Sequence, residues 1–71
     1  MDPYQELANG VIIQAVKDYR GALSQLKRNP RYKEALIMKK ECETFFQSEW
    51  FQILTALDGT TLMRKLQEEV K

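Results

Sequence analysis

The chain has 71 residues, enough for one small domain, and its 11 basic and 10 acidic residues argue neither for nor against a nucleic-acid partner. A chain of this length hides only about 60 % of the surface that its unfolded form exposes, so its folded state has little stability to spare. It has no histidine, and Cys42 is its only cysteine, which excludes an intrachain disulfide and the usual zinc ligand sets. One unpaired cysteine is typical of the reducing cytosol. The sequence opens without the regions of a signal peptide, and its apolar runs are too short to span a bilayer. We therefore expect one cytoplasmic domain over residues 1–71, with no metal, no cofactor and no membrane contact.

The first predicted element is a long amphipathic helix over about residues 3–28. Asp2 suits the N-cap and Pro3 the first helical position. Apolar residues then recur at spacings of three and four, which is the pattern of a helix with one buried face. They are Tyr4, Leu7, Ala8, Val11, Ile12, Ala15, Val16, Tyr19, Ala22, Leu23 and Leu26.

An alanine row runs along this helix, because Ala8, Ala15 and Ala22 follow one another at seven-residue intervals. Small side chains in such a row let another helix approach closely along that edge. Small domains also often gain stability by association, so we expect a homodimer, formed through this row or through the aromatic residues at 45–51. Gly10 and Gly21 could each mark a bend or a tight crossing, since a glycine inside a helix costs about 1 kcal/mol relative to alanine.

A second long helix is predicted over about residues 30–47, antiparallel to the first. Asn29 ends the first helix, because a residue before proline is pushed out of the helical conformation. The same Asn29 and Pro30 suit the N-cap and the first position of the next helix. No helix breaker follows before Gln47, and the apolar stripe consists of Tyr32, Ala35, Leu36, Met38, Cys42, Phe45 and Phe46.

Two shorter helices are predicted near the end of the chain, over about residues 49–57 and 60–69. Ser48 is a good N-cap, but it could also lie inside one continuous helix, so the sequence predicts either three or four helices. Asp58 and the glycine after it form a strong turn signal, and either Asp58 or Thr60 can cap the last helix. The predicted fold class is all-α, a small bundle in which two long antiparallel helices pack with the shorter ones.

The residues that usually carry enzyme chemistry are missing or poorly placed. Histidine, the usual general base near neutral pH, is absent. Cys42 lies on the predicted inner stripe beside Glu41 and Glu43, whose charges discourage a thiolate. These two carboxylates point to different faces of a helix and cannot share a site. With no glycine-rich phosphate loop either, we expect a protein that is not an enzyme.

Positive charge is concentrated in residues 27–40, where six basic residues and one acidic residue give a local net charge of +5, against −4 for the rest of the chain. Such a segment can bind the phosphates of a nucleic acid. It can equally be a solvated corner that keeps the protein soluble, and no recognised nucleic-acid-binding motif accompanies it. The basic residues are Lys27, Arg28, Arg31, Lys33, Lys39 and Lys40.

Residues 45–51 hold four of the seven aromatic side chains of the protein. Successive residues of a helix differ in direction by about 100°, so the four rings cannot all face the same core. The surplus rings either form an exposed patch that anchors a partner protein or are covered by a third helix. The candidates for such a partner-binding patch are Phe46, Trp50 and Phe51.

Three runs of the sequence resemble small uncharacterised proteins encoded on phages and integrated mobile elements of Gram-positive gut bacteria. They are residues 15–23 (AVKDYRGAL), 41–48 (ECETFFQS) and 54–59 (LTALDG), and the likeness extends over most of the chain. The resemblance implies a context: small non-enzymatic proteins of such elements often bind a host or phage protein and block or redirect it, including defence systems, while others are transcriptional accessories. We therefore expect an accessory protein of the bacterial cytoplasm that inhibits or redirects a host protein by binding it. The alternative is a nucleic-acid-binding transcriptional accessory that uses residues 27–40.

Overall fold

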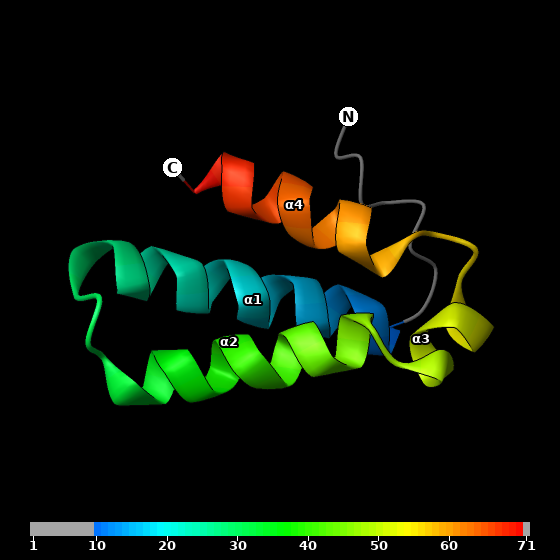
Figure 1. Ribbon diagram of the computed structural model, residues 1–71, viewed down its shortest axis with the longest axis horizontal. Helices are drawn as coiled ribbons and strands as arrows, with labels where there is room; N and C mark the ends of the chain where they lie inside the picture. Colours follow the sequence, from blue (N-terminus) through cyan, green and yellow to red (C-terminus); the bar gives the residue numbers. More distant parts are fainter. Residues whose placement is uncertain (1–9, 71) are drawn as a thin grey trace.

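The computed structural model describes residues 10–70, which form four helices and, within that range, no strand (Figure 1). Helix α1 spans Gly10–Arg28, α2 spans Lys33–Phe46, α3 spans Glu49–Leu54 and α4 spans Gly59–Glu69. The predicted all-α bundle, with two long helices followed by two shorter ones, is confirmed.

The predicted beginning of the first helix, from residue 3 onward, lies outside the described residues. The same is true of its predicted cap and of the first apolar positions of its stripe: Asp2, Tyr4, Leu7 and Ala8. The end of the helix is confirmed, because α1 ends at Arg28 as predicted. Pro30 accounts for this end, since it disfavours a helical conformation at the residue before it.

Helices α1 and α2 form an antiparallel hairpin, and α4 lies along one side of it (Figure 1). α4 packs against both α1 and α2, so it closes the core between the two long helices. The short α3 lies at the end of the molecule where α1 begins and α2 ends (Figure 1). The tight loop between α1 and α2 lies at the opposite end.

The turn between α1 and α2 is longer than predicted. Asn29 does not cap α2, because its backbone N–H still donates to the carbonyl of Gln25 at 2.8 Å and so completes the last turn of α1. The side chain of Asn29 accepts instead from the backbone N–H of Arg31 at 3.3 Å, which folds the loop. α2 begins only at Lys33, after an extended Tyr32 that makes no side-chain cap. The predicted start at residue 30 is wrong because these residues are needed to reverse the direction of the chain.

Ser48 separates α2 from α3, which decides between the two alternatives that the sequence left open. Its backbone is extended, and its Oγ accepts from the backbone N–H of Phe51 at 3.2 Å. The same hydroxyl donates to the carbonyl of Phe45 at 2.6 Å, so one side chain ends α2 and begins α3. α3 is shorter than the predicted 49–57, because Thr55 is extended and its Oγ1 accepts from the backbone N–H of Leu57 at 3.2 Å.

The start of α4 is set by Asp58 and Gly59. The carboxylate of Asp58 accepts from the backbone N–H of Thr60 at 3.1 Å and from the hydroxyl of Thr61 at 2.9 Å, so Asp58 is the cap and Thr60 is not. Gly59 is buried against the end of α2, where a Cβ atom would collide with the backbone carbonyl of Phe46. A glycine is therefore required for α4 to pack this closely.

The core lies where α1, α2, α3 and α4 meet. It contains apolar side chains from every helix, although the helices lie far apart in the sequence. The cluster consists of Ile12, Val16, Tyr19, Cys42, Phe46, Phe51, Leu62, Met63 and Leu66, with Ala15, Leu23, Phe45 and Leu54 packed against its edge.

Among the helices within residues 10–70, none combines the length and the apolar character that crossing a bilayer would require. The longest, α1, has 19 residues and is amphipathic.

Candidate functional site

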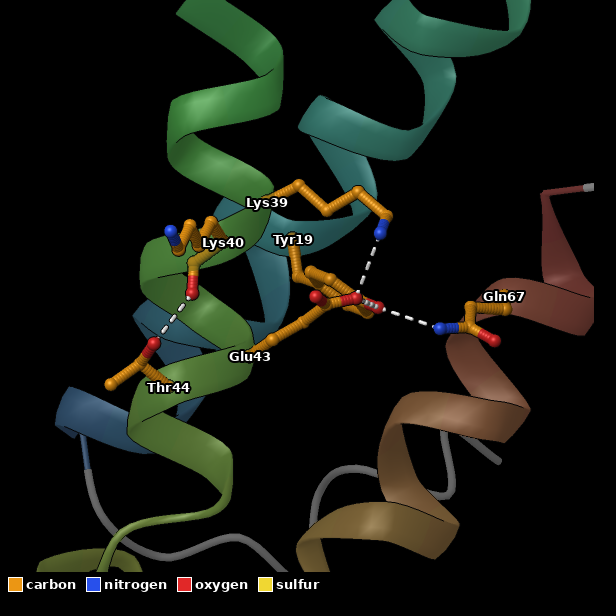
Figure 2. A network of polar contacts seen from close by, with 6 residues as sticks. All are labelled: Tyr19, Lys39, Lys40, Glu43, Thr44 and Gln67. Carbon is orange, nitrogen blue, oxygen red and sulfur yellow. Dashed lines mark hydrogen bonds and ion pairs between the residues drawn. The ribbon is translucent and has the colours of Figure 1, made fainter.

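A polar network ties three helices together at Tyr19 (Figure 2). The Tyr19 hydroxyl donates to Oε2 of Glu43 at 2.7 Å and accepts from Nε2 of Gln67 at 2.9 Å. Lys39 pairs with the same Glu43 oxygen at 3.0 Å. Burial raises the pKa of Tyr19 to about 12, so its hydroxyl keeps its proton at neutral pH and can donate to the carboxylate. These contacts satisfy a buried hydroxyl and hold α4 to the α1–α2 hairpin.

The single cysteine lies in the core and not at a reactive position. Burial, and then the charges of Asp18, Glu41 and Glu43, raise the pKa of the Cys42 thiol to about 11. The thiol is therefore protonated near neutral pH and is a poor nucleophile. Within residues 10–70, no group of three or more acidic or cysteine side chains lies close enough together to hold a metal ion.

Three of the four clustered aromatic rings pack inside the protein, which corrects the predicted partner-binding patch. Phe46 and Phe51 are fully buried, with ring centroids 5.6 Å apart in an edge-to-face arrangement. Phe45 is half-buried and contacts the rings of Phe46, Phe51 and Trp50, each at 5.7 Å. Phe46 and Phe51 therefore cannot contact a partner in this conformation, because both rings are buried in the core. Trp50 remains.

Trp50 is one of three exposed apolar residues of α3 and the loop that follows it, Trp50, Ile53 and Leu57, which we call the α3 patch. Trp50 is 55 % exposed and Ile53 is 80 % exposed, and Leu57 follows on the loop after α3. Trp50 and Ile53 are three residues apart, so they lie on the same face of α3. Phe51, one residue after Trp50, points into the core, and this contact turns the patch outward.

Ile53 and Leu57 were not among the predicted patch residues, because only aromatic side chains were considered as anchors. The three-residue spacing between Trp50 and Ile53 was a usable signal. The spacing alone does not show which face of such a short helix is buried. In the structure, the buried Phe51 marks that face.

The described part of the alanine row, Ala15 and Ala22, packs within this chain. Ala22 is buried within this chain and Ala15 is half-buried, while Ala8 lies outside the described residues. Ala15 lines a groove of about 460 Å³ between α1 and α2, together with Cys42 and Phe45. In the described part of α1, the row is thus turned toward the chain's own interior, where small side chains let α1 and α2 pack closely.

Four basic residues gather around the turn between α1 and α2, at the opposite end of the molecule from α3 (Figure 1). Lys27 and Arg28 end α1, Arg31 lies in the turn and Lys33 begins α2, and all four are exposed. None of the four has an ion-pair partner among the described residues.

The two remaining basic candidates do not belong to this cluster. Lys39 is engaged by Glu43, and Lys40 is exposed further along α2. The structure therefore separates the predicted basic segment into a four-residue corner and two lysines with other surroundings.

Comparison with known proteins adds no further guide to the function. Protein-family models, curated proteins and solved structures were each compared with this chain, and none of them matches it. What the protein binds has to be inferred from its own surfaces, above all from the α3 patch and the basic corner.

Proposed function

We propose that this protein acts without catalysis, by binding another protein through the α3 patch. The observation that carries the proposal is the exposure of Trp50 and Ile53 side by side on α3. Tryptophan is among the residues that most often dominate the free energy of protein–protein binding. An exposed group of large apolar side chains on so small a molecule is typical of an interaction surface.

The surroundings of the patch indicate what kind of partner surface fits it. The ring of Trp50 packs edge-to-face on Phe45 at 5.7 Å, so one side of the indole is held in place before binding. Holding a side chain in its bound position reduces the entropy that binding costs. Glu49 and Asp58, which are adjacent in sequence to Trp50 and Leu57, are exposed. A complementary partner would offer an apolar pocket for the indole with basic residues at its rim.

The resemblance to proteins of phages and integrated mobile elements supports a bacterial protein as the target. We propose an accessory protein that binds a host protein, such as a component of a defence system, and inhibits or redirects it. We also propose that the two meet in the cytoplasm, since an unpaired cysteine suits a reducing compartment.

The proposal is tested by affinity capture from a lysate of the bacterial host. Wild type, Trp50→Ala and Ile53→Glu are compared, with Tyr32→Ala as the control because Tyr32 is an exposed aromatic residue outside the patch. We expect Trp50→Ala to weaken binding of the captured protein at least about tenfold, as for a typical binding hot spot. Tyr32→Ala should leave the binding unchanged.

Trp50 also gives a direct signal, because it is the only tryptophan of the chain. Its emission should move to shorter wavelength when the partner covers it. Equal recovery of the same proteins by wild type, Trp50→Ala and Ile53→Glu, all shown to be folded, would contradict the proposal.

A second candidate function rests on the basic corner, where Lys27, Arg28, Arg31 and Lys33 are exposed and have no ion-pair partner among residues 10–70. We propose as the alternative that these residues bind the phosphates of a nucleic acid. Binding would then weaken steeply between about 50 and 200 mM salt, because each phosphate contact releases counterions. A mobility-shift assay at low salt tests this, and the absence of a shift with any duplex or single strand would overturn it.

A further inference from the structure

A groove runs between α1 and α2 on the side of the hairpin that faces away from α4. α4 packs against both long helices, and its Gln67 bonds to Tyr19 of α1. The groove is lined instead by Asp18, which lies about 100° around α1 from Tyr19, and by Glu41 of α2. All of its described lining residues come from α1 and α2. Among residues 10–70, α4 therefore covers one side of the hairpin and leaves the groove on the other side uncovered.

The groove is mostly apolar and is long enough to hold a helix. Val11 of α1 is 47 % exposed and Met38 of α2 is 38 % exposed, and both line it. Ala15 and Phe45 are half-buried between them. The lining residues extend from 10 to 18 on α1 and from 38 to 45 on α2, so the groove follows about two turns of each helix. A small residue such as Ala15 lets another helix approach closely.

The charged residues that line the groove are both acidic, one from each helix. Besides burial, the charges of Asp18 and Glu41 raise the pKa of the Cys42 thiol, so both carboxylates lie close to this part of the groove. Asp18 accepts a hydrogen bond from Gln14 at 2.9 Å, and neither carboxylate has an ion-pair partner within residues 10–70. Two carboxylates without a basic neighbour favour a partner of positive charge.

The groove is continuous with the α3 patch through Phe45. The ring of Phe45 lines the groove and also packs edge-to-face on Trp50, with ring centroids 5.7 Å apart. A partner that lies along the groove can therefore extend onto the indole of Trp50 across one unbroken apolar surface.

We infer that the partner presents an amphipathic helix that lies in the α1–α2 groove, with its apolar face inward and basic residues on its flanks. This inference rests on the proposed function, because it names the kind of surface that the partner of the α3 patch uses. The apolar face of the helix contacts Val11, Met38 and Phe45. Its lysine or arginine side chains pair with Asp18 on one flank and with Glu41 on the other. The added helix covers the open side of the hairpin, as α4 covers the opposite side.

The first test selects binders of the purified full chain from a display library of helical peptides. We expect the enriched peptides to carry apolar residues at positions i, i+3 or i+4, and i+7, since these form one face of a helix that docks in a groove. Lysine or arginine should be enriched beside that face. The strongest peptide is then synthesised with a fluorescent label, and its Kd is measured by anisotropy. The Kd should rise between about 50 and 200 mM salt, because salt screens the ion pairs.

Variants of this protein then locate the bound peptide. Met38→Lys and Glu41→Lys each place a positive charge in the groove and should weaken binding at least about tenfold. Ile37→Lys is the matched control for Met38→Lys, because Ile37 is exposed next to Met38 but does not line the groove. Glu68→Lys, at an exposed position of α4, is the control for Glu41→Lys. Both controls should leave the Kd nearly unchanged, and circular dichroism checks that all four variants remain helical.

Three results would overturn the inference. The first is a selection that yields no helical binder, or binders without basic flanks. The second is a peptide that binds Met38→Lys and Glu41→Lys as tightly as wild type. The third is a dimer by light scattering that Met38→Lys dissociates, because the groove would then hold a second copy of this chain.

The proposed function is judged separately by capture from the host lysate. If Trp50→Ala weakens the capture of a protein while Met38→Lys and Glu41→Lys do not, the α3 patch binds a partner and the groove does not. If Trp50→Ala changes neither the capture nor the Kd of the selected peptide, the proposed function itself is wrong.

Discussion

Gly59 and Gly21 show how differently two helical glycines can contribute to the same molecule. A Cβ atom at Gly59 would collide with the backbone carbonyl of Phe46, whereas a Cβ at Gly21 would have nothing within 4 Å. Gly59 lets α4 begin directly against the end of α2. Gly21 makes no close contact of this kind, so it marks no tight crossing of α1.

We therefore expect opposite effects when each glycine is replaced by alanine. Gly59→Ala should lower the free energy of unfolding by about 1–3 kcal/mol, the usual cost of overpacking, because the obstructing atoms belong to the backbone. Gly21→Ala should raise it by about 0.5–1 kcal/mol, because alanine is the better helix former. Urea unfolding followed by circular dichroism measures both. Equal shifts in the two variants would contradict this account of Gly59.

The polar network around Tyr19 makes stability depend on pH through Glu43. Partial burial raises the pKa of Glu43, but the hydrogen bonds from Tyr19 and Lys39 outweigh it and hold this pKa below its ordinary value of 4.5. A carboxylate with a lowered pKa stabilises the folded state above its unfolded pKa, and this contribution is lost as the pH falls through the folded value.

Wild type should therefore be more stable than Glu43→Gln at pH 7, and the difference should shrink as the pH falls below 4.5. The measurement is the urea midpoint of both proteins over a series of acidic pH values. Glu68→Gln, at an exposed position of α4, is the control for a general change in charge. A difference between wild type and Glu43→Gln that stays constant with pH would rule out the linkage.

At the scale of the elements, α3 depends on its cap more than the longer helices do. It has six residues, too few to be stable as an isolated helix. Two interactions hold it: the bond from the N–H of Phe51 to the Ser48 hydroxyl, and the burial of the Phe51 ring. The orientation of the α3 patch follows from both.

Ser48→Ala should cost about 1 kcal/mol of stability, the usual effect of losing an N-cap. It should also shift the emission of Trp50, because the cap begins the helix that carries this residue. Ser24→Ala, at an exposed position inside α1, provides the control and should change neither quantity appreciably. If both serine variants unfold at the same urea concentration, the Ser48 cap does not stabilise α3.

At the scale of the whole molecule, the core depends on α4 to cover a hairpin that two helices cannot close. Leu62, Met63 and Leu66 of α4 are buried against side chains of α1, α2 and α3. A domain of this size has a small margin of stability, so one core residue can decide whether the protein is folded.

Leu66→Ala should lower the free energy of unfolding by about 2–5 kcal/mol, because it leaves a cavity at a fully buried position. This loss is comparable with the total stability of a small domain, so we expect a broad and shallow thermal transition by circular dichroism. Leu57→Ala removes the same atoms from an exposed residue and should leave the transition nearly unchanged. A sharp transition at the wild-type temperature for Leu66→Ala would show that α4 contributes little to the core.

The features that could be predicted from the sequence are those set by neighbouring residues. The end of α1 at Arg28 follows from Pro30, and the caps at Ser48 and Asp58 follow from side chains that bond to backbone groups two or three positions away. Helical periodicity likewise indicated helices in all four regions, although it left open whether Ser48 separates α2 from α3. Errors of a few residues occurred where the chain turns, as at Lys33, because a turn must satisfy the packing of both helices that it joins.

A small helical bundle, with the approximate ends of its helices, can thus be predicted from local sequence patterns. Which of the clustered aromatic rings are buried and which are exposed depends on how the helices pack. Phe46 and Phe51 are buried, whereas Trp50 is exposed. Gly59 lets α4 pack against the end of α2 at Phe46. Because the Phe51 ring enters the core, its neighbour Trp50 lies on the outer side of α3. These contacts join residues from different helices, so they cannot be predicted from the spacing of residues along one helix.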